Sequence, residues 1–505
     1  MNLAKTLPED AVRRLTMSEI STVLAKVSDF LNTRGIQAYI VGGMVRDALI
    51  GRDTADIDLA VNADALQIAQ TLAAALDGHY VLLDPENRIG RVVLHPEKTP
   101  SIRAWWEIDI STIPGSIEAD LLQRDFTIDA MAIDLKQLQE DTTRIQIIDP
   151  FDGWSDMRQG IVRAVTDSAF AADPARLLRA VRLAAELGFT IDQKTESLIV
   201  RDSRLLNSIA GERNREELLG LLALPNAAQS ISYLDRLGLL TVMMPELIIT
   251  RGVTQPKEHH WDVFEHLLKT VEAIAFLLRE GTWEYAGEEA LASVPWSARL
   301  SQHFESGVGR GSSRTSLLKL AALLHDIAKP QTRAVIDNRV RFLGHGQEGA
   351  LIAAGILERL RFSTREVKLV ETEIKYHLRP TQMSQDGLPT RRAIYRYFRD
   401  TGETGIDILF LSLADHLATR GPTLDLTHWQ QHAQMVKYVL DQHFEQKVVS
   451  PPPRLIDGHD LINIFGLRPG PELGNILEAI REAQAAGEIT TRQEALAYVE
   501  SLLKR

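Results

Sequence analysis

The sequence has no cysteine, and this absence removes several kinds of chemistry. Disulfide bonds, thiolate metal clusters and thiol nucleophiles all require cysteine, so any metal must be bound by carboxylates and imidazoles. Long apolar runs are also missing: no stretch of about 18 apolar residues, the length that predicts a membrane-spanning helix, occurs. Residues 1–15 lack the apolar segment of a secretory signal. We therefore expect a protein of the reducing cytoplasm.

Basic residues are outnumbered by acidic ones, 56 to 68, which gives a formal net charge of −12. An acidic chain argues against a nucleic-acid partner, because phosphate binding requires positive potential. Net charge does not describe the local distribution, however. Arginines are concentrated in residues 176–182 and 391–399. These two segments are compatible with a nucleic-acid partner.

The first third of the chain alternates between strand-like and helix-like patterns. Residues 1–34 are predicted to form one or two amphipathic helices, followed by an α/β head at 35–165. Within the head, helices are predicted at 64–76 and 121–132. Strands are predicted at 37–41, 55–60, 90–94, 105–110 and 145–148.

The rest of the chain is predicted to be almost entirely helical, which makes the whole protein α+β. We divide it into a neck and body at 166–255, a second helical domain at 256–445 and a helical tail at 454–505. Residues 280–313, rich in glycine and serine, are predicted to be a loop or insertion. Three prolines at 451–453 predict a stiff linker before the tail. Periodic helices are predicted at 174–187, 213–224, 228–237 and 316–328.

A carboxylate pair follows a glycine pair near the end of the first predicted strand. Gly42 and Gly43 lie between that strand and a short helix, where glycine lets the backbone approach a phosphate closely. Arg46, in the first turns of the helix, is placed to reach the same anion. Asp56 and Asp58 are two residues apart on the next strand, so both project from one face. Such a pair can bind Mg²⁺ for in-line displacement at phosphorus.

Charged residues recur at every third position along a predicted helix, where they share roughly one face: Asp173, Arg176, Arg179 and Arg182. A carboxylate accepts a hydrogen bond from an exocyclic amino group, and a guanidinium donates to a ring nitrogen or a carbonyl. C and A both present an amino group beside an acceptor nitrogen, whereas U and G present a carbonyl there. An Asp–Arg pair can therefore select C and A with protein groups alone.

The second half of the chain carries an ordered set of imidazoles and carboxylates: His266, His325, Asp326, His345, His377 and Asp415. A single helical histidine is usually packed or solvated, but this set offers nitrogen and oxygen ligands from several helices. It predicts a site for one or two divalent ions. The alternative is a structural domain without activity. We interpret His259 and His260 as ordinary residues.

Residues 41–61 resemble the signature of the polymerase-beta-like nucleotidyltransferases, and more narrowly the class II tRNA nucleotidyltransferases and bacterial poly(A) polymerases. Similar segments follow in the family's order at 120–132, 149–153, 173–189 and 211–218. The resemblance implies Mg²⁺ at Asp56 and Asp58, and nucleotide selection by Asp173 and Arg176. It places further contacts to the nucleotide or triphosphate at Arg124, Arg179 and Arg182. The implied reaction adds C and A from CTP and ATP to the 3′ end of tRNA, releasing pyrophosphate.

Some positions depart from the family's usual pattern. Gln123 stands where a second arginine is common, Asp129 where an asparagine is, and Ala172 where a glutamate is. Segment 107–120 is also shorter than the loop that full CCA-adding members commonly carry. The short segment suggests a partial activity, with addition of CC as the first hypothesis. The candidates for a third carboxylate, on the strand just before it, are Glu107 and Asp109.

The imidazole and carboxylate set resembles the HD phosphohydrolase superfamily, which some tRNA nucleotidyltransferases carry as a fused domain. The resemblance implies core metal ligands at His266, His325, Asp326 and Asp415, with His345 and His377 serving a second metal or a phosphate. Metal-dependent hydrolysis of a phosphoester is therefore a second predicted activity. The tail resembles the C-terminal tRNA-contacting region of the nucleotidyltransferases, which favours tRNA over other RNA ends.

Three other functions stay open on the sequence. A poly(A) polymerase would use ATP and accept RNA ends other than those of tRNA. A metal-dependent HD phosphohydrolase would use the head only to bind nucleotide or RNA. A non-enzymatic RNA-binding scaffold would extend no RNA at all.

Overall fold

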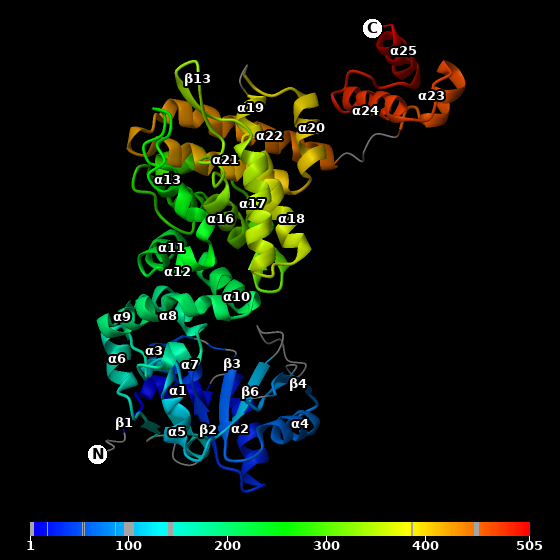
Figure 1. The fold of residues 1–505 in the computed structure, drawn as a ribbon. Helices are drawn as coiled ribbons and strands as arrows, with labels where there is room; N and C mark the ends of the chain where they lie inside the picture. Colours follow the sequence, from blue (N-terminus) through cyan, green and yellow to red (C-terminus); the bar gives the residue numbers. More distant parts are fainter. Residues whose placement is uncertain are drawn as a thin grey trace. The chain divides into compact units, whose positions relative to one another are not determined.

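The computed structural model describes residues 5–504 except 18, 53, 55, 86, 95–105, 140–144, 385–386 and 449–453. The chain divides into two compact units (Figure 1): residues 1–209 with 237–239, and residues 210–236 with 240–505. This division falls within the predicted neck and body at 166–255, and the predicted domain boundaries stay a prediction. The proposed proline linker at 451–453 lies outside the described residues.

The first unit is built on an eight-stranded mixed sheet in the order β1-β8-β7-β2-β3-β6-β5-β4. Its two central strands, β3 and β6, run parallel, whereas the other neighbouring pairs are antiparallel. The strands are β1 (Lys5–Thr6), β2 (Ala38–Val41), β3 (Asp56–Val61), β4 (His79–Asp84), β5 (Ile89–Leu94), β6 (Trp106–Thr112), β7 (Ala132–Asp134) and β8 (Gln146–Ile148).

Helices pack on this sheet through apolar faces. Helix α4 contacts β4, β5 and β6 with buried side chains such as Ile68 and Leu72. Its start is fixed by Asp64, whose side chain accepts hydrogen bonds from two backbone amides of the first turn. The helices of the first unit are α1 (Glu9–Met17), α2 (Glu19–Asn32), α3 (Gly43–Ile50), α4 (Ala65–Ala75), α5 (Ile117–Leu122), α6 (Gly153–Gln159), α7 (Ala169–Ala172), α8 (Arg176–Leu187) and α9 (Gln193–Asp202). Two short strands, β9 (Ile161–Val162) after α6 and β10 (Thr190–Ile191) between α8 and α9, pair in parallel.

Two expectations for the head differ from the structure. The predicted helix at 121–132 is wrong: α5 ends at Leu122, Thr127–Asp129 forms a 3₁₀ turn, and Ala132 begins β7. In this segment only Ala132 pairs in the sheet, with Val41 of β2 and Ile148 of β8, whereas Ile128 and Ala130 are buried in and just after the 3₁₀ turn. Local periodicity does not reveal this arrangement. Strand β4 was not predicted, because it is an edge strand whose apolar side chains are exposed, as at Leu82.

The second unit is helical, and its core lies between long apolar helices. Helix α13 packs against α16 and α21, and α18 packs against α16, α17 and α21. Its helices as far as the tail are α10 (Gly211–Leu222), α11 (Ala227–Arg236), α12 (Leu239–Met243), α13 (Val263–Leu277), α14 (Glu288–Ala292), α15 (Ala298–Glu305), α16 (Arg314–Leu324), α17 (His345–Arg359), α18 (Thr364–Tyr376), α19 (Arg379–Met383), α20 (Arg391–Thr401), α21 (Thr404–Arg420) and α22 (Leu426–Val448). This confirms the helical prediction.

The prediction of a loop at 280–313 is wrong in part. The segment contains α14, α15 and a small hairpin of β11 (Gly307–Gly309) and β12 (Ser312–Ser313). The two helices are short, and their N-cap residues, Gly287 and Ser297, are of types that a sequence pattern associates with loops. The Ser297 side chain caps α15 by accepting from the backbone amide of Leu300.

The tail forms three helices, α23 (Gly458–Phe465), α24 (Pro471–Ala485) and α25 (Arg492–Leu503), around a core of its own that includes Leu461 and Val499. Helix α24 contacts α20. At this contact Arg399 binds Glu478 at 2.8 Å and Glu482 at 3.0 Å, and Arg392 binds Glu488 at 2.6 Å. Arginines in the 391–399 segment are therefore engaged in ion pairs with the tail.

No helix among the described residues combines the length and apolar character needed to cross a bilayer.

Candidate active sites

The central parallel strands bring four carboxylates together in the first unit. Asp56 pairs in register with Glu107, and Asp58 with Asp109. Alternate residues of a strand share a face, so all four carboxylates lie on one side of the sheet. Neither the Asp56 nor the Asp58 carboxylate accepts a hydrogen bond in the part of the chain that the structure describes. Their oxygens are therefore free to bind a cation.

The glycine loop lies directly against this carboxylate group. Gly42 adopts a φ of +69°, and a Cβ placed on it would lie 2.9 Å from Asp58 Oδ2 and 3.0 Å from Arg124 Nη1. Any side chain here would both strain the backbone and displace these two groups. Gly43 begins α3, and a Cβ on it would lie 3.1 Å from Arg46 Nη2. The structure thus brings the predicted loop, Asp58 and Arg124 to one place.

Arg91 on β5 is the site residue that sequence reasoning missed. Its Nε donates to Asp109 Oδ1 at 2.6 Å, its Nη2 donates to Asp109 Oδ2 at 2.8 Å, and its Nη1 pairs with Glu107. One guanidinium thereby pairs with both outer carboxylates, whereas no hydrogen bond or ion pair to the Asp56 or Asp58 carboxylate is found among the described residues, although Arg124 lies close to Asp58. The sequence did contain a clue, because Arg91 is a basic residue within a predicted strand, and two other predicted strands carry acidic residues with which it could pair.

Burial raises the pKa of the Asp58 carboxyl to about 6, although Arg124 nearby lowers it. Repulsion from Asp109 adds to the rise. A carboxylate in this state is costly to ionise alone, so a bound divalent cation would stabilise its charged form.

Arg46 lies in the first turn of α3, as predicted, but its guanidinium is engaged by carboxylates. It is buried, and its guanidinium donates to Asp47 at 2.9 Å and to Asp129 at 2.6 Å. Asp129 is the position where the family usually has an asparagine, and its second carboxylate oxygen, Oδ2, has no hydrogen-bond partner among the described residues. The charge of Arg46 therefore balances two buried carboxylates in this structure, and its contact with a phosphate stays a prediction.

The predicted nucleotide-selecting residues lie around the start of α8. Asp173 precedes the helix in an extended conformation, and Arg176 is its first residue. Arg176 Nη2 donates to the Gln123 carbonyl at 2.6 Å, which fixes its side chain beside the loop that carries Arg124. Arg179 pairs with Asp125 at 2.9 Å and Arg182 with Glu186 at 2.8 Å. Their three-residue spacing along α8 places the three arginines on roughly one side of the helix.

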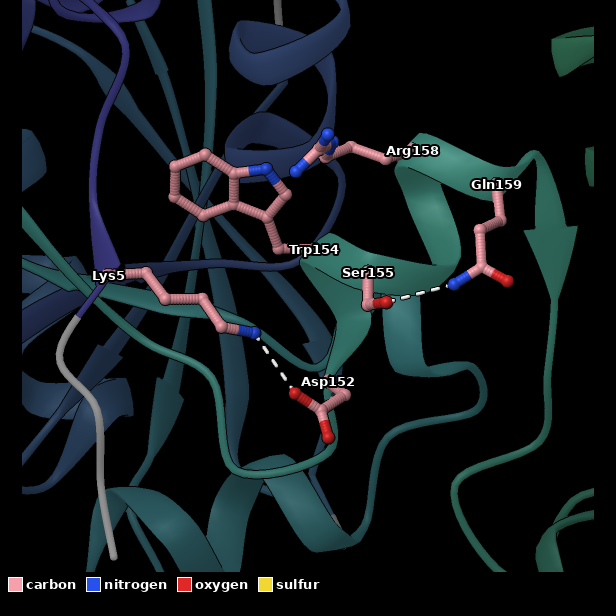
Figure 2. Close-up of a pocket in the computed structure, with 6 residues that line it drawn as sticks. All are labelled: Lys5, Asp152, Trp154, Ser155, Arg158 and Gln159. Atoms are coloured by element: carbon pink, nitrogen blue, oxygen red, sulfur yellow. Dashed lines mark hydrogen bonds and ion pairs between the residues drawn. The ribbon is translucent and has the colours of Figure 1, made fainter.

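A separate cavity of about 640 Å³ lies elsewhere in the first unit, between β1 and α6 (Figure 2). Lys5 bridges it by binding Asp149 at 2.8 Å and Asp152 at 3.0 Å. The Trp154 ring lines the cavity, with Arg158 near it. None of the residues predicted to bind nucleotide or metal lines this cavity.

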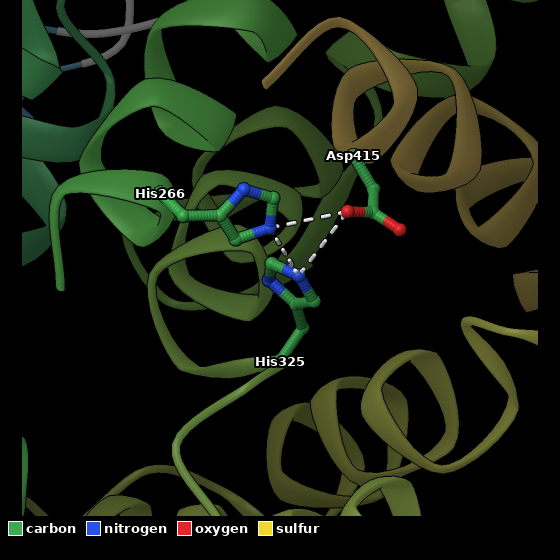
Figure 3. Close-up of side chains that lie close together, drawn as sticks. All are labelled: His266, His325 and Asp415. Carbon is green, nitrogen blue, oxygen red and sulfur yellow. Dashed lines mark hydrogen bonds and ion pairs between the residues drawn. The ribbon is translucent and has the colours of Figure 1, made fainter. Parts of the chain in front are cut away.

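The second unit gathers all six predicted metal ligands into one buried cluster, which we call the HD cluster: His266, His325, Asp326, His345, His377 and Asp415. His266 Nε2 lies 3.1 Å from Asp415 Oδ1 and 3.3 Å from His325 Nε2 (Figure 3). His345 Nε2 lies 3.2 Å from Asp326 and 3.2 Å from His377 Nε2. The ligand atoms form two groups of three, His266–His325–Asp415 and Asp326–His345–His377.

All four imidazoles of the HD cluster face inward with Nε2, and three of them are held by a hydrogen bond from Nδ1, whereas Nδ1 of His266 has no partner among the described residues. Nδ1 of His325 donates to the Ala322 carbonyl at 2.9 Å, and Nδ1 of His377 donates to the Ile374 carbonyl at 2.7 Å. His345 Nδ1 donates in the same way to Phe342. A histidine that donates from Nδ1 presents a lone pair at Nε2, which is the form that binds metals. Inward lone pairs about 3.2 Å apart repel each other unless a cation lies between them.

Further polar residues surround the cluster. Lys329 Nζ lies 2.5 Å from Asp326 and donates to Gln255 Oε1 at 2.6 Å. The ring of His259, which we interpreted as an ordinary residue, lies 5.5 Å from that of His266 and 3.5 Å from Lys329 Nζ. Lys329 follows Asp326 by one helical turn, so its proximity was readable from the sequence. The positions of Gln255 and His259 depend on the loop before α13, so they could not be predicted from the sequence.

Burial lowers the pKa of His377 to about 3, so this imidazole is neutral at physiological pH. Burial acts to raise the pKa of Asp415, but the hydrogen bond from His266, together with the attraction of His266 and His325, outweighs burial and holds that pKa below its usual range. Neutral imidazoles and ionised carboxylates are the forms that bind divalent metals. The donor set of the HD cluster therefore fits one or two such ions.

Comparison with protein families assigns a known type to most segments of the chain. Residues 38–163 match the poly(A) polymerase head domain, and 188–249 match a probable RNA- and SrmB-binding site of polymerase A. Residues 263–420 match the HD domain, and 353–499 match a putative second domain of tRNA nucleotidyltransferases. The matches cover both candidate sites and the tail.

Relatives with known activities match nearly the full chain. An A-adding tRNA nucleotidyltransferase of Deinococcus radiodurans is 34% identical, with 92% of this chain and 95% of that protein covered. A CC-adding tRNA nucleotidyltransferase of Thermus thermophilus is 33% identical, with 92% of this chain and 93% of that protein covered. The fold resembles the Thermotoga maritima CCA-adding enzyme solved with tRNA (TM-score 0.62, 22% identity, 100% of each chain covered).

Proposed function

This chain belongs to the class II tRNA nucleotidyltransferases that carry an HD domain, and we propose that it adds C or A to the 3′ end of tRNA without a template. The observation that carries the proposal is the carboxylate pair, Asp56 and Asp58, which lies against the Gly42 loop beside Arg124 and has no hydrogen-bond or ion-pair partner in the part of the chain that the structure describes. The α+β fold and the tail support the same family. The poly(A) polymerase and scaffold alternatives receive no comparable support from the full-length relatives.

In the reaction, the 3′-hydroxyl of the tRNA attacks the α-phosphorus of CTP or ATP. The bond to the β-phosphate oxygen breaks, and pyrophosphate leaves. Asp56 and Asp58 would hold Mg²⁺, which when bound neutralises charge on the phosphates and favours the ionised hydroxyl. Arg124, beside Gly42, is placed to bind the triphosphate, and Arg91 holds Glu107 and Asp109 so that they line the site without competing for it.

Selection of the nucleotide is assigned to Asp173 and Arg176. The carboxylate would accept from the exocyclic amino group of C or A, and the guanidinium would donate to the neighbouring ring nitrogen. The Arg176 hydrogen bond to the Gln123 carbonyl supports this role, because it orients the guanidinium before a nucleotide arrives. Arg179 and Arg182 would add positive charge along the same side of α8.

We propose that the activity is partial, with CC addition as the first candidate. The connection between β6 and α5 is short, running only from Ile113 to Ser116. The two full-length relatives described above are named for CC addition and for A addition separately. Addition of A alone is the second candidate, because the A-adding relative is as similar to this chain as the CC-adding one.

The deciding experiment extends three tRNAs, ending before CCA, after CC and after CCA, with CTP, ATP or both. Two C residues on the first tRNA and no extension of the second would confirm CC addition. A single A on the second tRNA alone would establish A addition. Extension of the first tRNA to a full CCA end would contradict partial activity, and no extension of any tRNA would contradict the proposed function.

We propose further that the HD cluster binds one or two divalent ions and hydrolyses a phosphoester. Four inward-facing Nε2 atoms and two carboxylates support this role, and Lys329 beside Asp326 is placed to bind a phosphate oxygen. The test is metal content after purification, together with hydrolysis of bis(p-nitrophenyl) phosphate. A protein that retains no metal and hydrolyses none of this diester would contradict the proposal.

A further inference from the structure

A two-stranded hairpin is inserted between two ligands of the HD cluster, Asp326 and His345. Strand β13 (Arg333–Ile336) pairs antiparallel with β14 (Arg339–Phe342). The turn is Asp337-Asn338, and both residues have positive φ, which is the geometry of a tight two-residue hairpin. Figure 1 shows the hairpin projecting from the helices of its unit.

Two arginines share one face of the hairpin. Arg339 and Arg341 are two residues apart on β14, so their side chains leave the strand on the same side, about 7 Å apart along it. Their cross-strand partners on that face are Ile336 and Ala334. The face thus carries two charges beside the apolar side chain of Ile336. Arg333 lies on the opposite face, in register with Phe342.

The hairpin arginines differ from most arginines of this unit. Arg333, Arg339 and Arg341 are exposed, and in the part of the chain that the structure describes none forms an ion pair. By contrast, Arg392 and Arg399 on α20 are neutralised by glutamates of the tail. Residues 329–344 contain four basic side chains and one acidic one, in a chain of net charge −12. The hairpin is a local positive site on an acidic protein.

The base of the hairpin contacts the HD cluster directly. The Phe342 ring lies 5.5 Å from Lys329 Nζ, and the Phe342 carbonyl accepts the hydrogen bond from His345 Nδ1. Lys329 in turn lies 2.5 Å from Asp326. The last residue of β14 thus helps to orient one imidazole of the cluster and covers its lysine. The base of the hairpin therefore lies next to the cluster, and Arg341 is the residue before Phe342.

From these observations we infer that the hairpin binds the phosphate backbone of a single-stranded RNA and that the HD domain acts on polynucleotides rather than on free nucleotides. Arginines at alternate strand positions can each contact one of two successive phosphates. Ile336 offers an apolar contact to a base between them. A free nucleotide is too small to use a charged arm beyond the metal ligands, whereas a strand is long enough.

The substrate assignment rests on the proposed hydrolase activity of the HD cluster. In the reaction, water adds to the phosphorus of one diester, one P–O ester bond breaks, and the leaving oxygen takes up a proton. The products are a phosphomonoester on one fragment and a hydroxyl on the other. No oxidant or further reactant is needed. The hairpin takes no part in bond breaking; it is a binding element for the strand.

The test compares two double variants of the full-length protein loaded with Mn²⁺. Arg339→Glu/Arg341→Glu reverses the charge of the hairpin face. Arg310→Glu/Arg365→Glu makes the same charge change at two other exposed arginines of the unit for which no ion pair is found among the described residues. Each is assayed on bis(p-nitrophenyl) phosphate and on a single-stranded RNA of about twelve nucleotides without a tRNA acceptor end.

We expect Arg339→Glu/Arg341→Glu to raise the KM for the RNA about tenfold. The slope of log binding constant against log salt concentration should fall by the amount expected for the loss of about two phosphate contacts. Hydrolysis of the small diester should be unchanged, which also shows that the variant is folded. The control variant should resemble wild type on both substrates. Equal KM values for RNA in the two variants would overturn the inference.

A failure of the hydrolase proposal is distinguishable from a failure of the hairpin inference. If wild type hydrolyses neither substrate, the hydrolase activity is refuted, and the polynucleotide substrate with it. RNA binding by the hairpin is then decided by hydrogen exchange: RNA should protect the amides of 333–342 in wild type and not in Arg339→Glu/Arg341→Glu. Absence of protection in wild type would refute the hairpin site itself.

Discussion

In the first unit the candidate metal ligands are carboxylates on neighbouring strands, whereas in the second they are mostly imidazoles at the ends or on the faces of helices. At the sheet surface Asp56 is exposed and Asp58 is half-buried, beside Glu107 and Asp109, which pair with Arg91. The HD cluster is almost entirely buried, and Asp415 is its most accessible ligand, with 25% of the side chain exposed. The more exposed site suits a hydrated ion that arrives with its nucleotide. The buried site suits an ion that stays bound.

The two sites also differ in how burial changes the pKa values of their ligands. At Asp58, burial raises the pKa to about 6, so the folded protein carries a carboxylate that is only weakly favoured in its charged form. In the HD cluster, burial lowers the pKa of His377 to about 3, whereas Asp326 outweighs burial and raises the pKa of His325, and His325 and Lys329 hold the pKa of Asp326 below its usual range. The Asp58 carboxylate therefore depends on a bound metal to stay ionised during the reaction. The HD cluster holds its ligands ready beforehand, through hydrogen bonds to backbone carbonyls.

The largest effect expected is the loss of nucleotide addition in Asp58→Asn. Removing one charge from this carboxylate pair should lower tRNA extension by about 1000-fold or more, because both carboxylates are needed to hold the metal. Hydrolysis of bis(p-nitrophenyl) phosphate should be unchanged, since that activity is assigned to the other unit. Both rates are measured on one preparation. A parallel loss of both activities would show that the two sites are not independent.

The converse variant is His266→Gln in the HD cluster. Loss of this metal ligand should lower the affinity for the metal and the rate of diester hydrolysis by about 100-fold, while tRNA extension stays within about twofold of wild type. His416→Gln, next to Asp415 in sequence but stacked on His432, is the matched control and should keep its metal. Metal content is measured by elemental analysis. Full metal occupancy in His266→Gln would remove His266 from the ligand set.

The pH dependence separates the two sites further. A proton competes with Mg²⁺ for Asp58 once the pH falls below the pKa of about 6. The Mg²⁺ concentration for half-maximal tRNA extension should therefore rise up to about tenfold for each pH unit below 6, and be nearly constant above about pH 7. Steady-state titrations across this range measure it. A half-maximal concentration that does not change on acidification would contradict the assigned role of burial at Asp58.

The smallest effect concerns stability at a third buried carboxyl, Glu373 on α18. Both of its carboxylate oxygens are buried with no hydrogen-bond partner among the described residues. Burial, and then repulsion from Asp407, raises its pKa well above the usual range. The folded state therefore holds this proton to higher pH than the unfolded state does. The contribution of Glu373 to stability thus falls as pH rises above about 4.5.

Glu373→Gln removes this titration and should raise the melting temperature by a few degrees at neutral pH, with a smaller gain near pH 5. Glu358→Gln, an exposed glutamate on the neighbouring helix α17, should change it little at either pH. Thermal unfolding followed by circular dichroism measures both. A gain that does not depend on pH would assign the effect to packing rather than to ionisation.

Much of the candidate site chemistry was predictable because it follows short-range rules. The spacing of Asp56 and Asp58 on one strand and of the α8 arginines on one helix depends only on strand and helix periodicity. The six ligands of the HD cluster were predicted as a set, and the structure brings all of them together. The helix predicted at 121–132 was wrong because its buried residues Ile128 and Ala130 lie in and after a 3₁₀ turn and Ala132 begins β7. Strand β4 was missed because its apolar side chains are exposed.

Sequence by itself thus determined which residue types are available for catalysis, their order along the chain and the α+β class. Tertiary structure alone decided which charges are left free. Arg91 pairs with Glu107 and Asp109, Arg46 pairs with Asp129, and three arginines of α20 pair with glutamates of the tail: Arg392, Arg396 and Arg399. The hairpin arginines remain exposed. The physical reason is that an ion pair between residues far apart in sequence depends on how sheets and helices pack, which local periodicity does not encode.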